Sequence, residues 1–122
     1  MTIAIIVGTR PEIIKMAPVI KELERRGAEF VFIHTGQHYD YEMSKIFIEE
    51  LALPQPNESF ALENANPAAQ IGEMMIKLEK ALERYRGRKP RIMLIQGDTN
   101  SMLATGLTAI KLSMRIGHVE AV

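Results

Sequence analysis

Two kinds of hydrophobic pattern alternate along the chain. Short apolar runs such as "IAIIV" at 3–7 contain no polar position, which is typical of strands buried on both faces of a parallel sheet. Longer stretches, such as 11–26, carry apolar residues every three or four positions, which is typical of amphipathic helices. These patterns predict strands over 3–7, 29–35, 91–97 and 115–121, and helices over 11–26, 41–53, 68–87 and 98–113.

Breaker residues divide these blocks. Pro18 lies within the first predicted helix and has no backbone N–H, so we expect a kink or a restart there. Gly27 follows as a natural helix terminator. Segment 54–67 is rich in proline and asparagine, which predicts a loop with a short strand over 59–62 as an option.

Strands that alternate with helices indicate βαβ units. We therefore predict an α/β fold, a three-layer Rossmann-like domain with a mostly parallel sheet, in which 1–122 form a single domain without internal repeats. No helix follows the last predicted strand, 115–121, so we expect the chain to be a piece of a longer protein. Its uncovered edge there favours self-association, and we expect a homo-oligomer.

Composition excludes several classes of function. The 15 basic and 15 acidic residues give a formal net charge of zero, which leaves no basic surplus for binding nucleic acid. Cysteine is absent, which excludes disulfides and thiol catalysis. The apolar run at the N-terminus is too short for a signal sequence or a membrane-spanning helix. We expect a cytoplasmic protein with neither nucleic-acid nor membrane partners.

Polar clusters follow the predicted strands, at the edge where open α/β sheets bind ligands. In "GTRPE", Thr9 and Glu12 can form a capping box that leaves Arg10 exposed. Alternatively, Pro11 is the first helical residue and Arg10 occupies the cap position, where Gly8 lets an anion approach the backbone. Lys15 lies one turn further along, either as part of this anion site or as a plain solvated lysine.

The other clusters carry candidate acids and bases. Asp98 is either an N-cap or an acid/base, because the hydroxyl and amide side chains of 99–101 can cap that helix instead. His118 and Glu120 lie two apart in a strand, so they point to one face as a hydrogen-bonded pair or as part of a site. With no third ligand, this pair does not predict a metal site. His38, in "GQHYDYE", fits a loop histidine better than a catalyst.

The motifs "GTRPEIIKMAP", "TGQH", "GDTNSMLA" and "GHVEA", in this order and spacing, resemble the N-terminal half of the non-hydrolysing UDP-N-acetylglucosamine 2-epimerases. The resemblance covers essentially the whole chain. It implies a GT-B arrangement of two Rossmann-like domains with the active site in the cleft between them. It also implies interconversion of UDP-GlcNAc and UDP-ManNAc without a redox cofactor, by elimination of UDP to 2-acetamidoglucal and re-addition after protonation at C2 on the other face.

The resemblance also implies roles for individual residues. Arg10 and Lys15 match basic residues at the cleft that contact substrate, and Asp98 and Glu120 match two catalytic carboxylates. His118 is then expected to bind at the site by orienting Glu120.

The family also has a loop that binds an activator and a second domain. Gln37 and His38 match a loop that helps to bind a second, activating UDP-GlcNAc in bacterial members, although Asp40 stands where some members have a polar amide. The family's C-terminal domain, which supplies most UDP contacts and a catalytic histidine, is absent from this chain.

We therefore expect the N-terminal domain of a UDP-GlcNAc 2-epimerase that is inactive by itself. One alternative is a non-catalytic module that binds a nucleotide sugar or dimerises through its last strand. Another is a fragment of a hydrolysing epimerase or of a GT-B glycosyltransferase, which release of free sugar or transfer to an acceptor would reveal.

Overall fold

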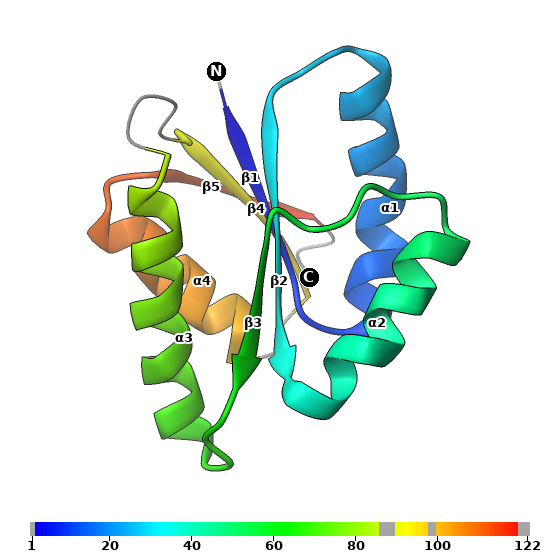
Figure 1. The fold of residues 1–122 in the computed structure, drawn as a ribbon. Helices are drawn as coiled ribbons and strands as arrows, with labels where there is room; N and C mark the ends of the chain where they lie inside the picture. Colours follow the sequence, from blue (N-terminus) through cyan, green and yellow to red (C-terminus); the bar gives the residue numbers. More distant parts are fainter. Residues whose placement is uncertain (1, 86–89, 98–99, 120–122) are drawn as a thin grey trace.

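The structure is a computed structural model that describes residues 2–85, 90–97 and 100–119, with the backbone alone for 37–41, 100 and 101. It contains one sheet between two layers of helices: α1 and α2 cover one face, and α3 and α4 cover the other (Figure 1). The elements are β1 (Ile3–Val7), α1 (Arg10–Arg25), β2 (Phe30–Gln37), α2 (His38–Glu50), β3 (Glu58–Leu62), α3 (Pro67–Glu83), β4 (Ile92–Gln96), α4 (Asn100–Lys111) and β5 (Arg115–Val119).

The sheet is parallel throughout, in the order β3-β2-β1-β4-β5. The chain moves outward from β1 to β3 and then crosses back to place β4 on the other side of β1. The strand order therefore reverses between β1 and β4, where open α/β sheets form a ligand crevice. The predicted α/β three-layer fold is confirmed, as is the optional strand within 54–67, which is β3.

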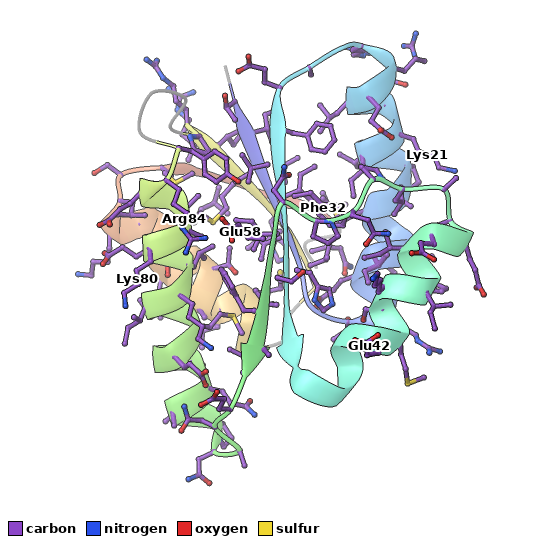
Figure 2. All side chains as sticks on the ribbon, viewed as in Figure 1. Lys21, Phe32, Glu42, Glu58, Lys80 and Arg84 are labelled. Carbon is purple, nitrogen blue, oxygen red and sulfur yellow. The ribbon has the colours of Figure 1, made fainter. Side chains whose placement is uncertain are left out.

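The core consists of two layers, one on each face of the sheet. Alternate residues of β1 serve both: Ala4 and Ile6 pack with α3 and α4, while Ile5 and Val7 pack with α1 and α2. All four side chains are fully buried, which explains why 3–7 contains no polar position. Phe32 of β2 fills the layer beneath α1 and α2 (Figure 2).

Helix α1 contains Pro18, where the sequence predicts a kink or a restart. The predicted restart is wrong, because α1 is one continuous helix with Pro18 inside it. The proline ring lies on the exposed side, and the carbonyl that its missing N–H leaves unbonded belongs to Ile14, which is also exposed. The opposite face buries four apolar side chains, which hold the helix against the sheet: Ile13, Met16, Ala17 and Ile20.

Helix α3 holds both ends of the edge strand β3. At the start of the strand, Arg84 pairs with Glu58 at 2.7 Å (Figure 2). Beyond its end, the Glu73 carboxylate accepts the backbone N–H groups of 63–64 at 3.0 and 3.1 Å. Lys77 pairs with Glu73 at 2.8 Å and donates to the carbonyl oxygen of Ala61 at 3.0 Å. The edge strand is therefore anchored by side chains as well as by its pairing with β2.

Lowering the pH should reveal what Glu73 contributes. Lys77, and then Asn64 and the backbone N–H groups of Glu63 and Asn64, lower the pKa of the Glu73 carboxyl from 4.5 to about 2. The pKa of Glu73 is lower in the folded state than in the unfolded state, so its contribution to stability is complete above the unfolded-state pKa. This contribution is lost as the pH falls through the folded-state pKa. Glu73→Gln should reduce the free energy of unfolding by about 1 kcal/mol at neutral pH and by less near pH 3. Urea titrations at both pH values measure this, and an equal difference at both would contradict it.

Two glycines with open space around them should respond to alanine in opposite ways. Gly27 ends α1 with a φ of 64°, as the sequence predicts, and the Ala28 N–H bonds to the Leu23 carbonyl. A Cβ on Gly27 or on Gly72 of α3 would meet nothing within 4 Å. Gly27→Ala should therefore lower the free energy of unfolding by about 1 kcal/mol, whereas Gly72→Ala should raise it by about 0.5–1 kcal/mol. Thermal unfolding of both variants measures this, and the same sign for both would be the contrary result.

Candidate functional site

The carboxyl ends of four strands meet at one edge of the sheet. A Cβ on Gly36, at the end of β2, would lie 3.5 Å from the carbonyl oxygen of Gly8, which follows β1. A Cβ on Gly97, which follows β4, would lie 3.9 Å from the Glu12 carboxylate. His118, near the end of β5, bonds through Nε2 to the Gly97 carbonyl oxygen at 2.7 Å. The described members of the four polar clusters therefore lie beside one another, as the sequence predicts.

The start of α1 forms a capping box. Thr9 is the N-cap, and its hydroxyl accepts the Glu12 N–H at 3.4 Å. The Glu12 carboxylate accepts the N–H groups of Gly8 and Thr9 at 2.7 and 3.0 Å. The prediction that Arg10 occupies the cap position is therefore wrong, because Arg10 is the first helical residue. Pro11 is compatible with this register, since its missing N–H still falls in the first turn, where no intrahelical partner is due.

The capping box changes what the loop can offer to a ligand. The N–H groups of Gly8 and Thr9 are bonded to Glu12, whose side chain is 2% exposed. A phosphate that approached this loop would compete with a buried carboxylate for the same two donors. Positively charged side chains around the loop are therefore better placed to hold an anion than its backbone.

The two predicted cations of this region are both exposed. The Arg10 guanidinium carbon lies 5.7 Å from the centroid of the Phe47 ring of α2. Such a contact contributes about 0.5–1 kcal/mol at an exposed site. It therefore orients the side chain but does not neutralise the charge of the guanidinium. Lys15 lies outside the buried face of α1. Both cations are therefore accessible to a ligand from solvent.

A hydrogen bond between His118 and Gly97 joins the ends of β4 and β5. Gly97 has a φ of 82°, which favours glycine. The acceptor is a carbonyl oxygen, so the His118 Nε2 carries the proton in this contact. The predicted carboxylates Asp98 and Glu120 lie outside the described residues.

The predicted activator loop falls at the junction of β2 and α2. Gln37 is the last residue of the strand, and His38 is the first residue of the helix. Their side chains lie outside the described part of the chain, as does that of Asp40.

Sequence reasoning underestimated the buried polar residues of this edge. Glu12 was expected only as half of a capping box, yet it is almost completely buried. Thr35 is fully buried and donates its hydroxyl to the Val7 carbonyl at 3.3 Å, and Gln96 is also buried. The available signal was a polar residue in the last positions of an otherwise apolar strand, as in "FVFIHT" and "IMLIQ".

The residues that the structure describes contain neither a metal site nor a membrane-spanning helix. Among them, no group of three histidine or acidic side chains is arranged to hold a metal ion. No helix formed by them is both long and apolar enough to cross a membrane.

Comparison with known proteins identifies relatives of this chain. The sequence model of the UDP-N-acetylglucosamine 2-epimerase family matches residues 21–121. A UDP-N-acetylglucosamine 2-epimerase of Methanococcus maripaludis is 49% identical over 119 residues, which are 98% of this chain and 31% of that protein. A UDP-2,3-diacetamido-2,3-dideoxy-D-glucuronate 2-epimerase of Pseudomonas aeruginosa is 38% identical over 122 residues, which are 99% of this chain and 34% of the relative.

A solved structure has the same fold. The UDP-GlcNAc 2-epimerase of Methanocaldococcus jannaschii, crystallised in complex with UDP-GlcNAc and UDP, superposes with a TM-score of 0.89 at 45% identity. The match covers 99% of this chain and 33% of the other. The chain thus spans about a third of the length of the relatives that it matches.

Removing the Glu12 carboxylate should destabilise the fold. Glu12→Ala leaves two N–H groups at the start of α1 without their acceptor, which costs about 2 kcal/mol. Glu24→Ala is the matched control, because Glu24 lies on the same helix but is exposed, and its change should be within about 0.5 kcal/mol. Urea unfolding of both variants measures the difference. Equal losses would show that the buried carboxylate does not stabilise this loop.

Proposed function

Because the chain belongs to the UDP-N-acetylglucosamine 2-epimerase family, we propose that it is the N-terminal domain of an enzyme that interconverts UDP-GlcNAc and UDP-ManNAc. The observation that carries this proposal is the superposition of nearly the whole chain on a relative crystallised with UDP-GlcNAc and UDP. The edge at which the four polar clusters meet is then this domain's side of the active site.

Asp98 and Glu120 are the proposed catalytic carboxylates. They follow Gly97 and Val119 directly, and the neighbouring strand ends Gln96 and Val119 are register partners in the sheet. Inversion at C2 requires removal of a proton from one face of the sugar and its return on the other, which takes two acid/base groups. Two carboxylates that emerge from adjacent strands suit this task.

The elimination step follows from the same chemistry. One carboxylate takes the C2 proton, the bond between C1 and the phosphate oxygen breaks, and its electron pair leaves on UDP. A C1–C2 double bond remains, which is 2-acetamidoglucal. Protonation of C2 on the opposite face and return of the UDP oxygen to C1 then give the epimer.

The leaving UDP gains negative charge, which cations stabilise. Arg10 and Lys15 are the proposed contacts to the phosphates or the sugar, because both are exposed beside the capping-box loop. Gln37 and His38, at the junction of β2 and α2, are the proposed contacts of an activating nucleotide sugar.

A second domain is part of the proposal. The chain spans about a third of the length of its relatives, and one edge of an open sheet cannot enclose a sugar nucleotide and exclude water by itself. We propose a GT-B arrangement in which a C-terminal domain closes the cleft, and a cytoplasmic homo-oligomer in which the isolated 122 residues are inactive.

A differently substituted sugar is the second candidate substrate. The Pseudomonas aeruginosa relative, at 38% identity, is a 2-epimerase of UDP-2,3-diacetamido-2,3-dideoxy-D-glucuronate. The reaction at C2 would be unchanged, and the substituents at C3 and C6 would differ. Parallel assays with both nucleotide sugars distinguish these candidates by their kcat/KM values.

Exchange at C2 tests the proposed reaction. The full-length polypeptide that carries this chain, incubated with UDP-GlcNAc in D2O, should incorporate deuterium at C2 and form UDP-ManNAc, both followed by NMR. The isolated 122-residue chain should do neither. Exchange by the isolated chain would overturn the two-domain proposal, and free sugar as the product would indicate a hydrolysing enzyme instead. A folded full-length protein without exchange would overturn the function.

The proposed carboxylates should be essential for exchange. In the full-length protein, Asp98→Asn and Glu120→Gln should each reduce kcat at least about 100-fold, the usual contribution of an acid/base group. Glu79→Gln is the control, because Glu79 is exposed on α3, and it should leave kcat unchanged. Wild-type activity in either carboxylate variant would remove that residue from the mechanism.

A further inference from the structure

We propose that Phe47 of α2 is a positioning residue that holds the Arg10 side chain ready for a nucleoside diphosphate. This role rests on the proposed function, in which Arg10 contacts the phosphates or the sugar of UDP-GlcNAc. Phe47 has no assigned contact with the substrate itself and acts through Arg10.

Arg10 occupies an unfavourable position for a cation. It is the first residue of α1, where the positive end of the helix dipole repels positive charge. The acidic residue of the same turn, Glu12, is buried and accepts the N–H groups of Gly8 and Thr9. The local structure of α1 therefore gives the guanidinium little reason to stay at the start of the helix.

The ring of Phe47 supplies such a reason from the neighbouring helix. Helices α1 and α2 lie side by side on one face of the sheet (Figure 1). The Arg10 guanidinium carbon lies over the Phe47 ring, 5.7 Å from its centroid, which is within the range of a cation–π attraction. The contact therefore joins the exposed start of α1 to the side of α2.

Phe47 is a firm support because it is partly anchored in the core. It is half-buried and packs against the hydrophobic layer that α1 and α2 form on the sheet. The next residue, Ile48, is 1% exposed and belongs to that layer. The ring thus has one part fixed by packing and another part available to the guanidinium.

An aromatic support suits a phosphate-binding arginine better than a carboxylate would. A carboxylate would neutralise the guanidinium and compete with the phosphate for its N–H groups. A guanidinium whose face rests on a ring keeps its charge, and its five N–H donors lie in its own plane. Phe47 can therefore restrict Arg10 before the ligand arrives and leave its donors free, which reduces the ordering cost of binding.

Phe30 offers a matched control for Phe47. It is also half-buried and packs against the same core layer. It is the first residue of β2, at the opposite end of the strand from the edge where the polar clusters meet. Replacing either phenylalanine by leucine removes the same atoms from one layer, but only Phe47→Leu removes the contact with Arg10.

The experiment uses the full-length polypeptide and measures the Kd of UDP by calorimetry, with kcat and KM for UDP-GlcNAc and the melting temperature. Phe47→Leu should raise both Kd and KM about two- to fivefold, which is the strength of a cation–π contact at an exposed site. Its kcat should stay within about twofold, because the phosphates are held in the ground state as well as the transition state. Phe47→Tyr, which keeps the ring, should recover most of the affinity.

A double-mutant cycle shows whether Phe47 acts through Arg10. In an Arg10→Ala background, Phe47→Leu should change the Kd of UDP by less than about 1.5-fold, because the cation that the ring holds is gone. Phe30→Leu should lower the melting temperature as Phe47→Leu does, yet leave the Kd of UDP unchanged in both backgrounds.

The contrary results separate this role from the proposed function. Three outcomes overturn the positioning role alone: wild-type affinity in Phe47→Leu, an equal loss of affinity in Phe30→Leu, or an undiminished effect of Phe47→Leu in the Arg10→Ala background. Wild-type affinity in Arg10→Ala removes Arg10 from the site, and Phe47 with it. A wild-type protein that neither binds UDP nor exchanges the C2 proton overturns the proposed function and this role together.

Discussion

The parallel pairing of β1 with both β2 and β4 is the interaction on which the rest of this structure depends. It buries Ile5 and Ile6 on opposite faces of the same strand, so helices must cover both sides of the sheet. It also directs every strand toward the same edge. Polar residues that are far apart in the sequence therefore meet where β1 and β4 end.

A buried carboxylate holds the centre of that edge. An isolated charge would be costly in this position, and Glu12 avoids the cost by accepting two backbone N–H groups. The same bonds close the start of α1 against β1. Stability of the helix and its attachment to the loop after β1 thus depend on one side chain.

The distribution of charge suits a domain that shares its active site. The cations Arg10 and Lys15 are exposed on the first turns of α1, while Glu12 beneath them is buried. The side chains that would meet a nucleotide sugar are therefore on the surface, and the groups that hold the backbone are inside. In the proposed enzyme, a second domain would bring the opposing wall and exclude water from these exposed cations.

The sequence by itself determined the class of the fold, because short apolar runs are typical of strands buried on both faces of a sheet, and a period of three to four is typical of amphipathic helices. It also placed the polar clusters at the strand ends and the terminator at Gly27. Tertiary structure decided the continuity of α1 through Pro18, the choice of Thr9 over Arg10 as its cap, and the bond from His118 to the Gly97 carbonyl oxygen. The last of these depends on which strands are neighbours and joins residues 21 positions apart, and no local pattern in the chain records it.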